Sequence, residues 1–180
     1  MIGLIGGSGL SQLDGLILQE QMQRATPFGE PSAPLMVGTF AGKEVAFLPR
    51  HGEHHTIPPH LINYRANIWA MHQLGVEQIL AVASVGGITE EYKPGVIALP
   101  DQLIDYSWGR ESSFASEDFA ADKHIDFTYP FDETLRQQIQ LAANSEEMSV
   151  IDGGSYAVTQ GPRLETAAEI GRFKKDGADN

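Results

Sequence analysis

The run "QILAVASVGGI" (residues 78–88) decides the fold, because it is almost continuously apolar and ends in a glycine pair. A strand that is covered on both faces has this composition, whereas a strand with one solvated face alternates apolar and polar residues. Such strands belong to α/β sheets, in which ligands bind at the carboxyl ends of the strands. The run therefore predicts a buried central strand, with Ser84 and the N–H groups after it placed toward a ligand.

The segments on either side of this run alternate between strand and helix patterns. Strands are predicted at residues 2–5, 95–106 and 155–159, and as a hairpin within 35–52 that turns at Gly42-Lys43. Helices are predicted at 64–74, 132–143 and 166–176, where apolar residues recur at helical spacing, and residues 107–124 form a loop. The predicted fold class is α/β, a single domain over residues 1–180 with a twisted mixed sheet flanked by helices.

Composition excludes several classes of protein. The 180 residues suit one domain and contain no cysteine, which rules out disulfides and thiolate chemistry. A formal charge of −12 argues against binding along a nucleic-acid backbone. The chain has no signal-peptide pattern and no apolar run near the ~18 residues of a membrane span. A cytoplasmic protein with neither nucleic-acid nor membrane partners is expected.

Two short segments could bind an anion. In "IGGSGL" (5–10), glycines free backbone N–H groups beside the hydroxyl of Ser8, although a tight strand-to-loop turn has the same sequence. In "PRHGEHH" (49–55), Arg50 offers a fork that fits phosphate oxygens and His51 adds a donor, unless the loop is merely solvated. These segments match neither the dinucleotide fingerprint nor the P-loop.

A metal site is the rival interpretation of the second segment. Four histidines fall within ten residues, namely His51, His54, His55 and His60. Their spacing does not match the H-E-x-x-H pattern, and no carboxylate stands at an expected ligand position. No metal is therefore predicted.

The segment "TQGPRLETAAEI" (159–170) places Glu165 at the start of a predicted helix. A carboxylate there interacts favourably with the helix dipole, by about 0.3–1 kcal/mol, and needs no further role. Alternatively, Glu165 reads a ligand. The residues of this segment alone leave both interpretations open.

Taken together, the chain resembles the nucleoside phosphorylases of the trimeric purine type, and within them the methylthioadenosine/methylthioinosine phosphorylase branch. The resemblance covers essentially the whole chain and follows the family's order of motifs. It rests on "GLIGGSGL", "TPFGEPSAPL", "LPRHGEHHTIPPHLINYRANIWA", "SVGGI", "LIDY", "HIDF" and "TQGPRLET".

The resemblance assigns roles to residues at matching positions. Phosphate would be bound by Ser8, Arg50, His51, Ala83 and Ser84. Tyr64 and His55 would lie near the sugar. His124 falls where the family reaches toward the 5′ group bound in a neighbouring protomer, which implies a homotrimer.

The resemblance also implies a reaction, the phosphorolysis of a purine nucleoside. Positive charge develops on the ribosyl ring and negative charge on the departing purine, so the protein mainly positions two reactants. Inorganic phosphate is the co-substrate, and no cofactor is expected. An ionised Glu only accepts hydrogen bonds, and hypoxanthine and guanine carry an N1–H donor where adenine has a lone pair. In the family this position is Ser or Thr in adenine-type enzymes and Glu in 6-oxopurine enzymes, so Glu165 points to a 6-oxopurine and, together with the resemblance of "HTIPP" and "NYRANIW" to the methylthio branch, to S-methyl-5′-thioinosine.

The family continues beyond the equivalent of residue 180 with a Met-Thr segment, an Asp or Asn that contacts the purine N7, and a final helix. The chain is therefore expected to be C-terminally incomplete, and the catalytic group for the leaving base is unassigned within it. The full protein is expected to be an enzyme. Alternatives are a methylthioadenosine or inosine/guanosine phosphorylase, a hydrolytic nucleosidase, a histidine-cluster metalloenzyme, and a purine-binding module if the chain is truly truncated.

Overall fold

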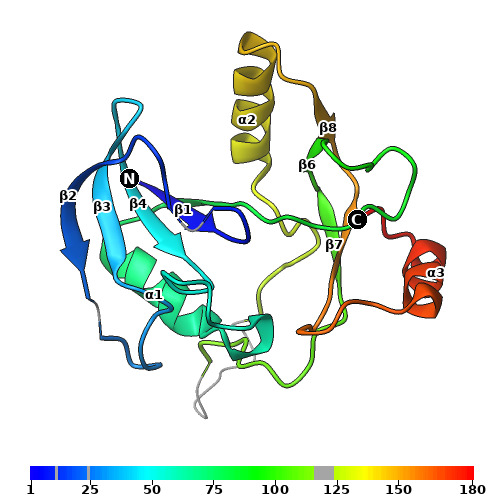
Figure 1. The fold of residues 1–180 in the computed structure, drawn as a ribbon, viewed down its shortest axis with the longest axis horizontal. Coiled ribbons are helices and arrows are strands. Elements are labelled where there is room, and N and C mark those ends of the chain that lie inside the picture. Colours follow the sequence, from blue (N-terminus) through cyan, green and yellow to red (C-terminus); the bar gives the residue numbers. More distant parts are fainter. Residues whose placement is uncertain (11, 24, 116–123) are drawn as a thin grey trace. The chain divides into compact units, whose positions relative to one another are not determined.

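The computed structural model describes residues 1–10, 12–23, 25–115 and 124–180, and Figure 1 shows their elements. The chain forms two compact units, one of residues 1–84 with 109–115 (unit 1) and one of residues 85–108 with 116–180 (unit 2). Part of the loop expected at 107–124, residues 116–123, lies outside the described residues. The single domain expected over residues 1–180 stays a prediction.

Unit 1 contains a five-stranded sheet in the order β2-β3-β4-β1-β5. Its strands are β1 (Ile2–Gly6), β2 (Ile17–Met22), β3 (Leu35–Phe40), β4 (Lys43–Pro49) and β5 (Gln78–Ala81). Strand β1 pairs in parallel with β4 and β5, whereas β3 pairs antiparallel with β2 and β4. The expected mixed sheet is confirmed. Because strands β4, β1 and β5 run parallel, their three carboxyl ends lie together at one end of the sheet.

The predicted hairpin is β3 and β4, but its turn is one residue earlier than expected. Phe40 pairs with Lys43, so Ala41 and Gly42 form the turn, and Lys43 already belongs to β4. Both turn residues have positive φ, 47° at Ala41 and 76° at Gly42. A two-residue turn with two positive φ angles matches the right-handed twist of the paired strands, which explains this register.

The strand predicted at 78–88 is shorter and less buried than expected. Strand β5 ends at Ala81, and residues 81–87 are exposed. Within the described part of the chain, β5 lies at the edge of its sheet and pairs only with β1. The prediction of burial on both faces was wrong, because no side chain of β5 is fully buried and Ala81 is exposed.

Helix α1 (Tyr64–Gln73) packs on the sheet of unit 1, as Figure 1 shows. The side chain of Asn63 caps its first turn by accepting a hydrogen bond from the N–H of Ala66 at 3.1 Å. Gly75 follows its last turn with φ 77°, as a helix end requires. Its Ala70 and Met71 are fully buried in the core of this unit, together with Ile5, Ala33, Leu35, Val37, Ala46, Leu48 and Val76. A 3-10 turn over Pro59–Leu61 precedes α1.

Unit 2 contains two parallel two-stranded sheets. Strand β6 (Ile97–Leu99) pairs with β8 (Val150–Asp152), and β7 (Gln102–Asp105) pairs with β9 (Ser155–Val158). The single strand expected at 95–106 is therefore two strands that belong to different sheets. Pro100 lies between them, and proline removes a donor from the hydrogen-bond ladder of a sheet.

Helices α2 (Glu133–Ser145) and α3 (Ala167–Asp176) complete unit 2 and confirm the predicted helices. Asp132 caps α2 by accepting a hydrogen bond from the N–H of Leu135 at 2.6 Å. Gly177 ends α3 in the left-handed region at φ 91°. The small core of this unit consists of Ala157, Phe173 and Ala178, with Ile88, Ile104, Tyr106 and Ile170 packed around them.

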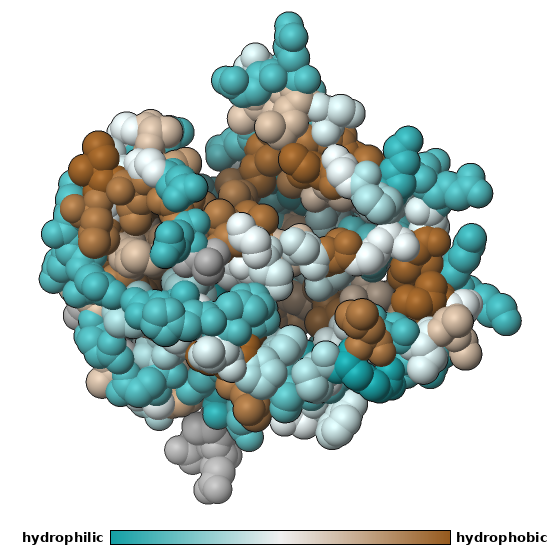
Figure 2. Space-filling model, viewed as in Figure 1, coloured by the Kyte–Doolittle hydropathy of each residue, from teal (hydrophilic) through white to brown (hydrophobic). Residues whose placement is uncertain are grey.

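Apolar side chains also lie on the surface, as the brown areas of Figure 2 show. In unit 2 the most exposed are Ile125, Tyr129 and Leu164, with 85%, 82% and 86% of their surface accessible.

Candidate active site

The loop after β1 is a compact turn that leaves Ser8 exposed. The N–H of Leu10 donates to the carbonyl of Gly7 at 3.0 Å, and Gly9 has a φ of 83° that favours glycine. The hydroxyl of Ser84 donates to the carbonyl of Ser8 at 3.1 Å. Two of the predicted phosphate contacts are thereby neighbours, although they are 76 positions apart in the sequence.

Arg50 follows β4. It lies at the same end of the sheet as the loop after β1, because β4 runs parallel to β1. Its backbone N–H donates to the carbonyl of Gly6 at 3.0 Å, and its guanidinium donates to the carbonyl of Val82 at 2.8 Å. The guanidinium also passes so close to Gly7 that a Cβ there would overlap it. Arg50 is therefore held among the ends of β1, β4 and β5, and Ala83 lies exposed between Val82 and Ser84.

The side chain of His51 is buried and has a defined tautomer. Its Nδ1 lies 2.8 Å from the carbonyl oxygen of Ile57, and because a carbonyl only accepts, Nδ1 carries a proton. Burial lowers the pKa of His51, and the charges of Arg50 and His55 lower it further, against the opposing effect of the hydrogen bond to Ile57. In the neutral ring Nε2 is an acceptor. A further N–H donor on His51, as expected for phosphate from the sequence, would require the protonated ring, whereas the neutral ring offers an acceptor at Nε2.

Tyr64 and His55 also belong to unit 1. The hydroxyl of Tyr64 donates to the carbonyl of Pro59 at 2.9 Å and accepts from Arg110 at 3.1 Å. Burial raises the pKa of Tyr64, although the charges of Arg110 and Arg50 lower it. A sugar hydroxyl could therefore use only the remaining lone pair of this oxygen. The ring of His55 lies 4.5 Å from that of His51, between their centroids.

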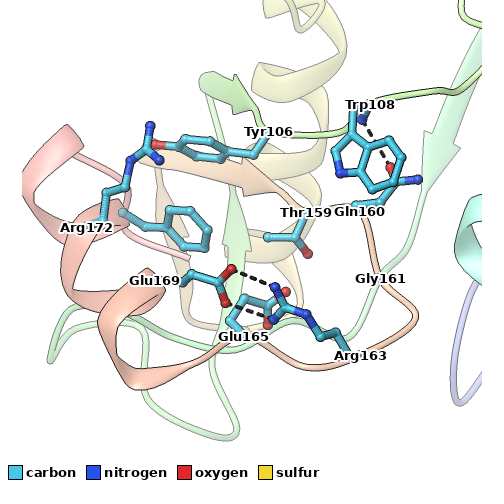
Figure 3. Close-up of a pocket in the computed structure, with 10 residues that line it drawn as sticks. Tyr106, Trp108, Thr159, Gln160, Gly161, Arg163, Glu165, Glu169 and Arg172 are labelled. Atoms are coloured by element: carbon cyan, nitrogen blue, oxygen red, sulfur yellow. Dashed lines mark hydrogen bonds and ion pairs between the residues drawn. The ribbon is translucent and has the colours of Figure 1, made fainter.

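Unit 2 contains a pocket of about 270 Å³, near the lower end of the roughly 300–1,000 Å³ typical of small-molecule sites. Figure 3 shows that its walls come from the end of β7, the segment after β9 and helix α3. The residues that line it are Tyr106, Trp108, Thr159, Gln160, Gly161, Arg163, Glu165, Glu169, Arg172 and Phe173.

Glu165 is half-buried in this pocket, between β9 and the first turn of α3. It precedes Thr166, the cap of α3, and so lies outside the helix. In the described part of the chain its carboxylate makes no hydrogen bond or salt bridge. A carboxylate that faces a pocket with its acceptor oxygens unused is suited to a ligand that donates.

Near Glu165, the side chain of Glu169 binds both Arg163 and the first turn of α3. The guanidinium of Arg163 binds the carboxylate of Glu169 with both terminal nitrogens, at 2.9 and 2.7 Å. Glu169 also accepts from the N–H of Thr166 at 2.7 Å, while the hydroxyl of Thr166 accepts from the N–H of Glu169 at 3.2 Å. The hydrogen bonds from Arg163, and after them those of the capping box with Thr166, lower the pKa of Glu169 to about 2.

Aromatic side chains and a second arginine form the other side of the pocket. The ring of Tyr106 lies on that of Phe173, with centroids 4.5 Å apart, and the Tyr106 hydroxyl donates to Asp176 at 2.7 Å. Arg172 lies over the ring of Tyr106 at 5.7 Å. The backbone N–H of Trp108 donates to the side-chain oxygen of Gln160 at 3.2 Å. The pocket thus combines flat apolar surfaces with a few polar groups, as sites for aromatic ligands do.

His124 is exposed and precedes the exposed Ile125. Among the described residues there is no group of three or more His, Asp or Glu arranged to hold a metal ion. In the same residues no helix is long and apolar enough to cross a membrane.

A model of the "Phosphorylase superfamily" matches residues 1–180. The chain belongs to this superfamily.

Individual relatives show which phosphorylases this chain is similar to. A probable S-methyl-5′-thioinosine phosphorylase of Pseudomonas syringae pv. tomato is 49% identical over 98% of this chain and 72% of its own length. An S-methyl-5′-thioadenosine phosphorylase of Pyrococcus furiosus is 44% identical over 97% of this chain and 66% of its own length. The structure of methylthioadenosine phosphorylase from Schistosoma mansoni in complex with adenine matches with a TM-score of 0.91 and 34% identity, over 99% of this chain and 71% of that one.

These findings confirm the expected family, the nucleoside phosphorylase-like α/β fold and the expected enzyme class, a pentosyltransferase. The residues expected to bind phosphate come together in unit 1, where Arg50, Ser8 and Ser84 share one edge of the sheet. Glu165 and His124 belong to unit 2.

Several residues of this phosphorylase were not expected from the sequence. Arg110, which donates to Tyr64, falls in a segment that shows no pattern. Arg163 and Glu169 lie in and just after the motif "TQGPRLET", where the spacing Thr166-x-x-Glu169 is the sequence signal of a capping box. Tyr106 ends the motif "LIDY" and could have been found there.

Proposed function

We propose that this protein cleaves S-methyl-5′-thioinosine with phosphate, giving hypoxanthine and 5-methylthioribose 1-phosphate. An oxygen of phosphate forms the new bond to C1′ while the bond from C1′ to N9 breaks and leaves its electron pair on the purine. The observation that carries the proposal is Glu165, a half-buried carboxylate in the pocket of unit 2 whose oxygens accept no hydrogen bond from the residues that the structure describes.

Hydrogen-bond chemistry favours a 6-oxopurine at Glu165. Hypoxanthine presents an N1–H that the carboxylate accepts, whereas adenine presents a lone pair that faces it repulsively. A site that is built to pair one polar group rejects an analogue that leaves its own group unpaired, by up to about 10⁴–10⁵-fold. Tyr106 and Phe173 supply aromatic surfaces beside this carboxylate.

Phosphate is the second substrate of the proposal, and Arg50 is its principal contact, with Ser8, Ala83, Ser84 and His51. The exposed Ser8 next to Ser84, and an arginine held at three strand ends, support this assignment. Phosphate supplies both the nucleophile and the counter-charge for the ribosyl cation, so the proposal includes no cofactor and no metal. Tyr64 and His55 are proposed to lie near the sugar.

The proposal extends to a homotrimer in the cytoplasm, in which His124 of one protomer approaches the 5′ group bound by another. The support is the exposure around His124, where Ile125 and Phe127 are 85% and 62% accessible. A second copy that packed against these two side chains would remove their apolar surface from water.

The test is the release of free base from three nucleosides, with and without phosphate. S-methyl-5′-thioinosine, S-methyl-5′-thioadenosine and inosine are offered in parallel, and the products are separated by chromatography. We expect phosphate-dependent release that is fastest from methylthioinosine. Release without phosphate would replace the proposal by a hydrolase. Preference for methylthioadenosine would mean that Glu165 is only an acid at the start of a helix. Preference for inosine would mean that the substrate carries a 5′ hydroxyl and not a methylthio group. Binding of hypoxanthine without turnover would indicate a purine-binding module.

A further inference from the structure

We infer that Glu169 acts as a positioning residue for substrate specificity, by holding Arg163 in an ion pair that leaves the carboxylate of Glu165 available to the base. The inference rests on the proposed function and deepens it. The charge that could neutralise Glu165 lies two residues away, and the fold binds that charge elsewhere.

The first observation is how completely Glu169 engages Arg163. Both terminal nitrogens of the guanidinium donate to the two carboxylate oxygens, at 2.9 and 2.7 Å, and one of them also donates to the carbonyl of Leu164 at 3.1 Å. Figure 3 shows both contacts, with Glu165 beside the same guanidinium. A side-on pair of this kind fixes the plane and position of an arginine as well as its charge.

The second observation is that the charge of Glu165 already acts on Arg163. Its pKa is raised mainly by the hydrogen bonds to Glu169, and the charge of Glu165 contributes a further increase. The two groups are therefore near enough to interact, yet no salt bridge joins them within the described residues. If Glu169 lost its charge, Glu165 would be the carboxylate nearest in sequence for Arg163 to bind.

The third observation is that Glu169 is itself fixed by the helix. It closes the capping box of α3 with Thr166, the residue that follows Glu165. One carboxylate thus holds the backbone after Glu165 and the cation before it. A base reader needs this arrangement because an ionised glutamate that is already paired with arginine has fewer oxygens to offer N1–H.

The experiment separates charge from structure. Glu169→Gln keeps the capping box, since glutamine serves at this position as glutamate does, but it cannot bind Arg163 as an anion. Arg163→Gln/Glu169→Gln removes the released cation as well. The matched control is Glu133→Gln, which removes a first-turn glutamate paired with Arg136 at 2.6 Å in α2, away from the pocket. Each variant is titrated with hypoxanthine by calorimetry and assayed with methylthioinosine and methylthioadenosine.

We expect Glu169→Gln to bind hypoxanthine about tenfold more weakly or worse, with the loss in kcat/KM for methylthioinosine arising mainly from KM. The ratio of methylthioinosine to methylthioadenosine cleavage should fall with it. The double variant should recover most of both losses, and Glu133→Gln should match the unmodified protein. Recovery on removing a second residue is a result that a purely structural role of Glu169 does not give.

Two results would overturn the inference. One is a Glu169→Gln protein with unchanged hypoxanthine affinity and unchanged base preference. The other is a double variant as impaired as the single one, since Glu169 would then act by supporting α3. The unmodified protein separates this inference from the proposed function. If it binds hypoxanthine but prefers another nucleoside, the proposed function fails and the titrations still decide the role of Glu169. If it does not bind hypoxanthine, both fail.

Discussion

At position 165 a single carboxylate distinguishes two classes of purine base. We expect Glu165→Ser to lower hypoxanthine release from methylthioinosine by more than tenfold, because the N1–H donor of the base loses its charged acceptor. Adenine release from methylthioadenosine should fall less or rise, since a hydroxyl can donate to the bare N1. The ratio of kcat/KM for the two nucleosides measures the effect. An unchanged preference for hypoxanthine would mean that Glu165 does not read the base.

At position 7, in contrast, the structure has room only for a residue without a side chain. A Cβ at Gly7 would overlap the guanidinium of Arg50, which the chain holds against the carbonyl of Val82. We therefore expect Gly7→Ala to raise the KM for phosphate by about tenfold or more, because Arg50 must move and its charge-assisted contacts to phosphate are lost. Hypoxanthine affinity should stay unchanged.

The control for this substitution is Gly171→Ala in α3, where a new Cβ meets no atom within 4 Å. Alanine in a helix interior is favoured over glycine by roughly 0.5–1 kcal/mol, so this variant should be at least as stable as the original protein. Its KM for phosphate should not change. A Gly7→Ala protein with the same phosphate KM would show that Arg50 is not a phosphate contact.

Among the elements, α3 depends most clearly on pH. Its first turn is held by Glu169, whose pKa of about 2 lies below its ordinary value of 4.5 because the ionised form binds Arg163 and the N–H of Thr166. The unfolded chain therefore takes up the proton first as the pH falls. The stabilisation should be complete above about pH 4.5 and be lost as the pH falls toward 2. Titration of the Glu169 side-chain carbon by NMR measures this pKa, and a midpoint near 4.5 would contradict the ion pair of Glu169 with Arg163 and its hydrogen bond from Thr166.

The elements also show how far a sequence can be interpreted without a structure. Helices α1, α2 and α3 were predicted because their signals are local: the cap at Asp132, glycines after α1 and α3, and apolar residues at helical spacing. Strand β2 was missed, since Ile17–Met22 is mostly exposed and no apolar pattern separates it from a loop. The burial of β5 was overestimated because its place at a sheet edge depends on pairing with distant segments.

The same distinction applies to the candidate site. Arg50, Ser8 and Ser84 were named because their motifs resemble those of the family, since each of these turns taken alone is equally compatible with a plain strand-to-loop connection. Arg110 could not be named, because its contact to Tyr64 spans 46 positions and follows from tertiary folding alone. The tautomer of His51 was equally out of reach, since it is fixed by the carbonyl of Ile57.

At the scale of the whole molecule, the two units have cores of different sizes. Among the described residues, nine buried apolar residues form one cluster in unit 1, whereas three form the cluster of unit 2. Local opening is easier where less apolar surface is buried. The segment that carries Glu165 belongs to the unit with the smaller core. A ligand that binds there should therefore reduce local opening more than a ligand that binds in unit 1.

Hydrogen exchange with each ligand alone would assign the two ligands to their units. A ligand that binds only the closed form at about 100 times its Kd stabilises that form by about 2.7 kcal/mol, or about a hundredfold in exchange rate. Phosphate should slow exchange in residues 6–10 and 50–52, and hypoxanthine should slow it in residues 159–169. In the absence of ligand, β1 and β4 should exchange more slowly than β7 and β9, because they border the larger core. Protection by phosphate at 159–169, with none at 50–52, would contradict the placement of Arg50 and Glu165 at different substrates. Protection by each ligand at its own segment would support the assignment of phosphate to the segment of Arg50 and of the base to the segment of Glu165.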